Sequence, residues 1–163
     1  MIKTIHIILV TIFIIGLNSS IPALALLREH HQSPGVLRYH AQHSIQDRQQ
    51  RAWQVILFPE DQLTATKYYL RLVGFPGLVN FIHPQSLEVI TSEGNVLIAP
   101  DVFAQNTPAP NVGQYDVTEI LSEFPSKGSV KLIFSLLGDN NEIEELTLKI
   151  SPTIMTEWQW LYR

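Results

Sequence analysis

Apolar and polar residues alternate with a period of two through most of the chain after residue 35. This alternation is typical of β-strands that bury one face and expose the other. It predicts seven strands, at residues 36–44, 52–58, 67–75, 87–91, 96–99, 129–137 and 143–150. Residues 26–34 are polar without a clear period, so we expect either a flexible lead-in or an edge strand there.

Turn residues separate these strands and join most of them as hairpins. Gly94 and Asn95 lie between two alternating apolar segments, which is a strong hairpin signal. Residues 47–50 form a second expected turn. Pro59 is expected to end its strand, because proline cannot donate to a backbone ladder.

Two segments have a helical pattern instead. Residues 116–124 begin with Asp116 and carry Glu119 three positions later, as in a capping box. Ser151 and Pro152 open a second segment as cap and first-turn residue. The sequence therefore predicts a mainly β fold: an antiparallel sandwich or partly open barrel of about seven strands with two short helices.

The first 25 residues have the pattern of a cleaved signal peptide. Lys3 precedes an apolar run of 13 residues, 5–17, which is shorter than the ~20 needed to cross a bilayer. The Ala23-Leu24-Ala25 sequence matches a cleavage site. We expect an exported protein whose single globular β-rich domain spans residues 26–163, with a retained membrane anchor as the alternative.

The net charge and the absence of cysteine limit the classes of function that the sequence allows. Without residues 1–25 the chain has 10 basic and 15 acidic residues, a net charge of −5. That balance argues against a nucleic-acid partner, and we expect contact with a membrane to be peripheral at most. The chain has no cysteine, which excludes disulfides, thiol catalysis and cysteine metal ligands.

Histidines are the first candidates for chemistry. His40 and His43 lie three apart on an expected strand, so their side chains point to opposite faces. A metal could be held by His31 with His40 or His43 only if the lead-in folds back. The alternative is a set of exposed or edge-strand histidines, and we predict no metal and no cofactor.

Catalytic motifs for nucleophilic, metal-hydrolytic or phosphate chemistry do not occur in the sequence. His83, Asp101 and a serine such as Ser86 could converge in space, because chain order does not limit a triad. Asp101 also suits a cap or an Asx turn before Val102 and Phe103. We therefore assign no catalytic residue and lean towards a protein that is not an enzyme.

Arg71 is the most informative charged residue, because it is a lone arginine between Tyr69 and Val73 on one face of a strand. Three interpretations remain open: an ion pair with a carboxylate such as Asp101 or Glu88, an exposed position, or an anion-binding site.

The segment 97–116 is long, rich in proline and almost uncharged. We expect it to cross the sheet and to insert Val102, Phe103 and Tyr115, with its prolines holding the turn outward. Asn111 and Tyr115 are binding candidates on this segment. Trp160 is a further one, because it lies two residues after Trp158 on a helix and cannot share its face.

The runs "RLVGFPGLVNFIHPQSLEV" and "APDVFAQNTPAPNVGQYDV" and the terminal "EWQ" resemble a family of small exported cyanobacterial proteins classed as a domain of unknown function. The opening "LREHHQSPGVLRYHAQHSIQD" with "WQVILF" is similar to that family too. The resemblance covers nearly the whole chain after the signal. It implies a location in the periplasm or thylakoid lumen, and it implies no activity.

These observations support three hypotheses. The first is a non-enzymatic binding or assembly module outside the cytoplasm that has a protein partner and assists a photosynthetic membrane complex. The second is a carrier of a small molecule or lipid in a β-cup. The third is a hydrolase or metal-binding protein that uses His83, Asp101 and their neighbours.

Overall fold

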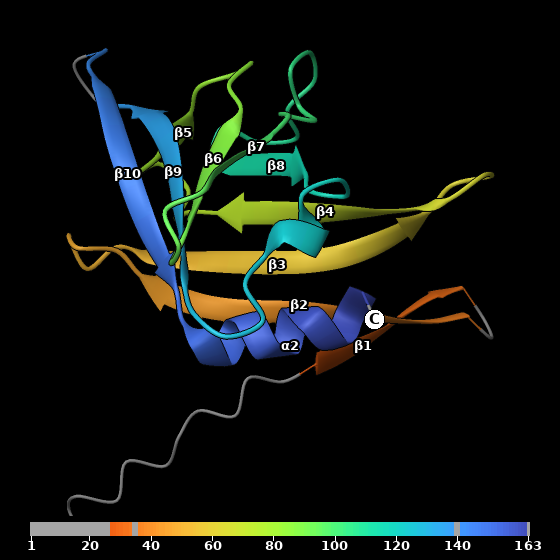
Figure 1. Cartoon of the computed structure of the whole chain (residues 1–163). Helices are drawn as coiled ribbons and strands as arrows, with labels where there is room; N and C mark the ends of the chain where they lie inside the picture. The colour runs from red at the N-terminus through yellow and green to blue at the C-terminus, as the bar shows by residue number, and fades with distance from the viewer. Residues whose placement is uncertain (1–26, 34–35, 139–140, 163) are drawn as a thin grey trace, which may run out of the picture.

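The computed structural model describes residues 27–33, 36–138 and 141–162, with side chains from Tyr39 onward (Figure 1). The expected signal peptide, residues 1–25, and the side chain of His31 lie outside the described part. The fold is mainly β, as predicted, and consists of two antiparallel sheets.

The first sheet has five strands in the order β1-β2-β3-β4-β8. They are β1 (Leu27–Ser33), β2 (Val36–Gln46), β3 (Ala52–Asp61), β4 (Thr66–Val73) and β8 (Val112–Asp116). The second sheet has the order β10-β9-β6-β7, and β5 pairs with β9. Its strands are β5 (Asn80–Phe81), β6 (Leu87–Thr91), β7 (Val96–Ala99), β9 (Val130–Leu137) and β10 (Ile143–Ile150). In Figure 1, β9 and β10 cross β2, β3 and β4 steeply, as in sandwiches with near-orthogonal sheets.

The core lies between the inner faces of the sheets. The buried indole of Trp53 on β3 meets the rings of Phe81 and Phe134 edge-on, at centroid distances of 5.9 and 5.2 Å. The helix α2 (Pro152–Tyr162) lies along β2 and adds Met155 and Trp158 to the same core. These aromatic contacts fill the space between the sheets, and α2 covers one open side.

The structure contains three strands, β1, β5 and β8, in addition to the seven that alternation predicts. The polar lead-in forms β1, an edge strand paired with β2, which confirms the edge-strand alternative. The short strand β5 pairs with the end of β9, and β8 pairs with β4. None of the three alternates clearly between apolar and polar residues, because backbone pairing and not a repeating buried face defines them.

The prediction of a helix at residues 116–124 is wrong. Asp116 ends β8, and only one 3-10 turn follows, η1 (Leu121–Glu123). The carboxylate Oδ1 of Asp116 accepts hydrogen bonds from the backbone and the hydroxyl of Thr118, at 3.1 and 2.6 Å. The aspartate therefore closes a turn two residues long instead of capping a helix.

Pro59 does not end β3, contrary to the prediction. The ladder between β2 and β3 stops at the Ala41–Leu57 pair, but the ladder between β3 and β4 continues to Asp61 and Thr66. The proline thus coincides with the end of one ladder while the other continues past it.

The segment 97–116 links the two sheets. After β7 the chain turns to the edge of β8, where the amide of Val102 donates to Gln114 and the amide of Asp116 donates to Pro100, at 2.8 and 3.0 Å. Tyr115 is buried in the core as expected, but Val102 is 41% exposed, so only part of the predicted insertion is correct. Residues 104–108 project into solvent, as the prolines predict.

Candidate functional site

The outer face of the first sheet points away from the core. Alternate residues of its strands lie on this face, and opposite partners define rows across the sheet. The row that contains Arg71 runs Gln42–Ile56–Arg71–Gln114. The next row runs Ser44–Gln54–Val73–Val112. Arg71 is the only ionisable residue among the eight residues of these two rows.

Arg71 is fixed on this face by two neutral groups. Its Nε and Nη2 donate hydrogen bonds to the amide oxygen of Gln114, at 2.8 and 2.6 Å. Its guanidinium carbon lies 5.0 Å from the ring centroid of Phe58, within the range of a cation–π contact. No carboxylate of the described residues lies within 4.0 Å of the guanidinium, so neither Asp101 nor Glu88 is its partner.

Burial lowers the pKa of Arg71, and the charge of Glu60 offsets this effect only in part. The guanidinium nevertheless stays protonated, since arginine is charged at any pH at which proteins fold. The result is a half-buried positive charge that is oriented but not neutralised, which is the arrangement that an incoming anion can complete.

A shallow pocket of about 260 Å³ lies at the end of the same face. Val73 and the exposed Phe75 and Pro76 give it apolar walls. Polar groups of Ser44, Gln54 and Asn111 also line it. Asn111 is itself buried, and its amide nitrogen donates to the carbonyl of Gly74 at 2.8 Å. Of the sequence candidates, Arg71 and Asn111 therefore contribute to this outer face and its pocket.

His83 and Asp101 do come together, but in a closed arrangement. Nδ1 of His83 lies 2.6 Å from Oδ2 of Asp101. The same carboxylate accepts hydrogen bonds from the backbone amides of Gln85 and Phe103. The bond from Phe103 is the Asx turn that the sequence predicts. The other ring nitrogen, Nε2 of His83, is buried without a hydrogen-bond partner.

The serine named for a triad, Ser86, is exposed. The residue that hydrogen-bonds across to β9 from this loop is Gln85, whose Nε2 donates to Ser135 at 2.9 Å.

Tyr115 lies in the core near Asp101. Burial raises the pKa of the Tyr115 phenol, and the negative charge of Asp101 raises it further. These groups hold the segment 81–103 in place and do not line the outer-face pocket.

The two described candidate histidines on β2 point to opposite faces, as predicted. His43 is buried beneath α2, where its Nε2 lies 3.5 Å from Oε2 of Glu157, and His40 is half-buried. Among the residues that the structure describes, no three metal-ligating side chains gather at one point. On α2, Trp160 is 70% exposed while Trp158 is fully buried, which matches the expected division of the two indoles.

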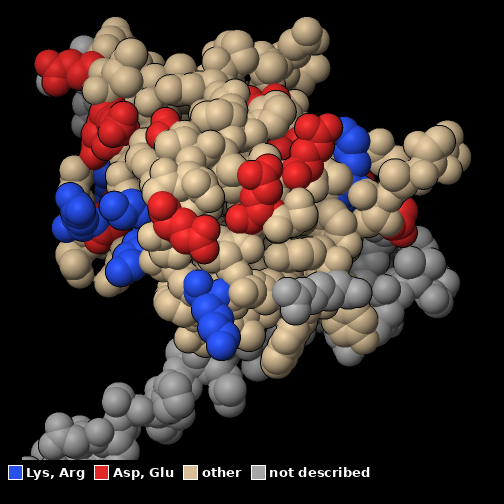
Figure 2. All heavy atoms as spheres, in the orientation of Figure 1, with Lys and Arg blue, Asp and Glu red and all other residues tan. Residues whose placement is uncertain are grey.

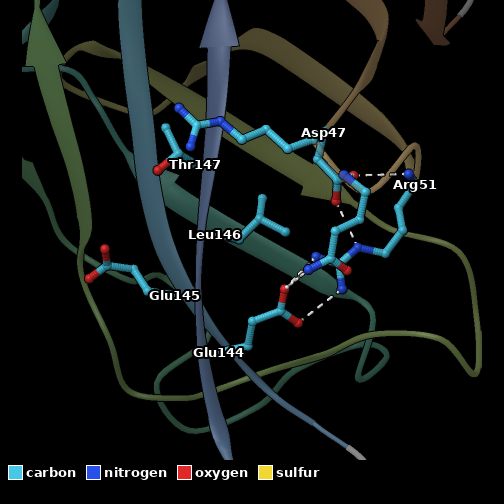
Figure 3. A pocket seen from close by; sticks show the side chains of 8 residues that line it. Asp47, Arg51, Glu144, Glu145, Leu146 and Thr147 are labelled. Carbon is cyan, nitrogen blue, oxygen red and sulfur yellow. Dashed lines mark hydrogen bonds and ion pairs between the residues drawn. The ribbon is translucent and has the colours of Figure 1, made fainter.

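The sequence gives no signal for a second, polar pocket of about 130 Å³ between the β2–β3 turn and β10 (Figure 3). Arg51 donates through Nε to Asp47 at 2.7 Å and through both terminal nitrogens to Glu144, at 3.0 and 2.8 Å. We call Asp47, Arg51 and Glu144 the inter-sheet clamp, because it joins a turn of the first sheet to a strand of the second.

The single cation of the clamp, Arg51, is shared between its two carboxylates, Asp47 and Glu144. Burial raises the pKa of Asp47, but hydrogen bonds from Arg51 and Trp53 outweigh that effect and lower it overall. The hydrogen bond from Arg51 lowers the pKa of Glu144. Its charges are already paired, so this pocket suits structural stabilisation better than ligand binding.

Figure 2 shows a different face, over η1 and α2, where acidic and basic side chains form small separate groups on a mostly uncharged surface. No helix among the described residues is long and apolar enough to cross a membrane.

The fold and the outer face thus define a small two-sheet β domain in which Arg71 is oriented by Gln114 and has no carboxylate partner among the described residues. The family model described as "Protein of unknown function (DUF3122)" matches residues 25–161, and the chain belongs to this family. The search of curated proteins gives no match, and neither does the search of solved structures.

Proposed function

We propose that the protein is a non-enzymatic binding module that holds a protein partner against the outer face of its first sheet. The observation that carries the proposal is Arg71, a half-buried cation without a carboxylate among the described residues. A carboxylate of a partner would replace the water lost by the guanidinium and form a charge-assisted hydrogen bond.

Several features of the face support this role. Gln114 and Phe58 hold the guanidinium in one orientation, which reduces the entropy lost on binding. The other residues of its row and of the next row are uncharged, and the nearest acidic group on β8, Asp116, is already paired with Lys67, at 2.8 Å. Without residues 1–25 the chain has a net negative charge, which repels acidic partners. The positive charge of Arg71 therefore has a specific role in the recognition of an acidic group.

The arrangement of His83 and Asp101 favours a binding protein over a hydrolase. A general base must reach its substrate directly or through one water molecule. The only ring nitrogen of His83 that is not bonded to Asp101 is enclosed by the fold, near the rings of Phe81 and Phe103. The filled core, with Trp53 against Phe81 and Phe134, likewise gives no support to a carrier with a β-cup.

Export is part of the proposal. The cationic start, the apolar run of 13 residues and the Ala23-Leu24-Ala25 sequence support removal of residues 1–25 and a location in the periplasm or thylakoid lumen. The absence of cysteine allows the domain to fold there without oxidation. In this location the partner would be an exposed part of a membrane complex, such as a photosynthetic one.

The test is a native purification of the tagged, full-length protein from its own host, with the Arg71→Gln variant in parallel. We expect a stoichiometric partner with the wild type and a loss of at least about tenfold with Arg71→Gln, which corresponds to ~1.4 kcal/mol. Lys149→Gln is the matched control, because Lys149 is an exposed cation on β10 of the other sheet. Unfolding curves of each variant exclude a loss caused by misfolding.

A lone monomer from the wild type would contradict the proposal. Equal recovery of the partner with Arg71→Gln would contradict it as well. The variant Trp160→Ser tests the other exposed candidate: loss of the partner through this change alone would move the interface to α2.

A further inference from the structure

The outer face offers a second feature beside the charge. Val73 follows Arg71 by two residues on β4, so both side chains point outward on the same face. Residues two apart on a strand are separated by about 6.7 Å. Val73 lines the 260 Å³ pocket, so the pocket begins one row away from the guanidinium.

The pocket is suited to an apolar side chain. Its volume exceeds that of a leucine or phenylalanine side chain, and Phe75 and Pro76 form walls on which an aromatic ring can pack. Phe75 is 65% exposed, so this ring surface is open to a ligand.

The distance from Arg71 to the start of the pocket at Val73 equals the distance between alternate residues of a β-strand. In an extended peptide, side chains at positions i and i+2 lie on the same side, about 6.7 Å apart. A peptide that runs alongside β4 across this face can therefore place an acidic side chain on Arg71 and an apolar side chain in the pocket. Neighbouring positions in the peptide would point away from the face.

We infer that the outer face binds an extended peptide segment in which an acidic residue and a large apolar residue are two positions apart. This inference rests on the proposed function, since it names the recognition element of the partner. The charge complementarity of Arg71 selects an acidic side chain, and the pocket selects an apolar one.

The probe is the capped pentapeptide acetyl-SESFS-amide, added to the folded protein labelled for NMR. We expect it to shift the Nε signal of Arg71 together with the side-chain amide signals of Gln54 and Asn111. The peptide acetyl-SEFSS-amide has adjacent acidic and aromatic residues, and acetyl-SQSFS-amide has no charge. Both should bind at least about fivefold more weakly, because each can satisfy only one of the two subsites.

Protein variants separate the subsites. Arg71→Gln should remove the preference for glutamate over glutamine in the peptide, and Phe75→Ser should remove the preference for the i,i+2 spacing. Leu78→Ser is the matched control for Phe75→Ser, because Leu78 is exposed to the same extent, 66%, in the same connection but does not line the pocket. It should bind the first peptide as the wild type does.

Three results would overturn the inference. Peptides with either spacing could bind equally, or none of them could shift these signals at millimolar concentration. Alternatively, the free acid acetyl-SSSSF could bind better than acetyl-SESFS-amide, which would assign the site to a chain terminus. If one of these results is found while capture of the partner still depends on Arg71, the proposed function stands and the recognition element is different. If the peptides bind as expected but Arg71→Gln captures the partner as well as the wild type does, the proposed function is wrong and the peptide-binding site is still supported.

Discussion

The buried indole of Trp53 donates a hydrogen bond from Nε1 to Oδ2 of Asp47, at 3.1 Å. This contact connects the centre of the core to the inter-sheet clamp, because the same oxygen of Asp47 also accepts from Nε of Arg51. The other oxygen, Oδ1, accepts from the backbone amides of Gln49 and Arg51, at 2.8 and 2.9 Å. One carboxylate thus orders a turn, a core side chain and a cation.

The first prediction concerns the loss of this carboxylate. Asp47→Ala leaves the Trp53 indole N–H and two backbone amides without an acceptor, so we expect a loss of about 2–4 kcal/mol in the free energy of unfolding. Urea unfolding at pH 7 measures it. The control Arg48→Ala changes the adjacent exposed residue and should alter stability by less than about 0.5 kcal/mol. A loss below about 1 kcal/mol for Asp47→Ala would mean that water replaces the carboxylate.

The second prediction is a loss of stability in acid. The pKa values of Asp47 and Glu144 are lower in the folded protein than the ordinary values of 3.8 and 4.5. Their stabilisation is therefore complete above those ordinary values and disappears as pH falls through the lower folded values. Burial also lowers the pKa of His43 from 6.5, so protonation of this ring opposes folding below about pH 6.5.

Urea unfolding at a series of pH values from 8 to 2 measures this dependence. The free energy of unfolding should fall in two stages, first below about pH 6.5 and then below about pH 4.5. The variant His43→Gln should remove the first stage, and the double variant Asp47→Asn with Glu144→Gln should reduce the second. Protonation of Glu157, whose pKa burial raises, has the opposite sign, so the contradicting result is a profile that is flat between pH 7 and 5 in the Glu157→Gln variant.

The third prediction concerns the partner of His43 on α2. Burial raises the pKa of Glu157 above 4.5, so folding favours its neutral form, and ionisation at higher pH removes stability. Glu157→Gln should therefore raise the urea midpoint at pH 8 and make no difference well below pH 4.5, where the native carboxyl is protonated. Glu145→Gln on β10 is an exposed control. A lower midpoint for Glu157→Gln at pH 8 would show that an ionised pair with His43 stabilises the helix.

The fourth prediction divides the segment 97–116 into a tip and an anchor. The amides of Phe81 and Gly74 donate to the carbonyls of Pro110 and Asn111, at 2.7 and 3.0 Å. Replacing residues 106–111 with glycine and serine should cost more than about 2 kcal/mol, because the change removes Asn111 and the rigidity of two prolines. Replacing only the exposed residues 104–107 should cost less than about 1 kcal/mol.

Thermal and urea unfolding of both replacements measure the division. Asn111→Ala should account for about 1–3 kcal/mol by itself, since it leaves the carbonyl of Gly74 without its buried donor. Equal costs for the two replacements would contradict a separate anchor.

The sequence predicts an element well where a local signal and the tertiary packing agree. The β6–β7 hairpin has alternating residues around Gly94 and Asn95, and its strand bounds match the expected ones. The helix α2 begins at Pro152 after Ser151, whose hydroxyl lies 3.4 Å from the amide of Ile154. In both cases residues at the turn or cap define the element: Gly94 adopts a positive φ of 91° in the hairpin, and Ser151 precedes the helix.

The candidate site could be predicted only in part. Arg71 is visible as a lone arginine between Tyr69 and Val73 on a strand, but its neighbour Gln114 belongs to β8, which has no alternating pattern. The position of β8 beside β4 depends on a connection through the other sheet, and no periodicity carries that information. The clamp is similarly non-local, since Arg51 and Glu144 are 93 residues apart in the chain.

The place of β8 also has a consequence for how the chain folds. Along the chain, β5, β6 and β7 of the second sheet lie between β4 and its neighbour β8, and β9 and β10 follow β8. Neither sheet is built from one continuous stretch of the chain. The two sheets therefore form one cooperative unit with many contacts between distant parts of the sequence, and such topologies fold slowly. The outer face of the first sheet is complete only when β8 has joined β4, so binding of the proposed partner would report on the folding of both sheets.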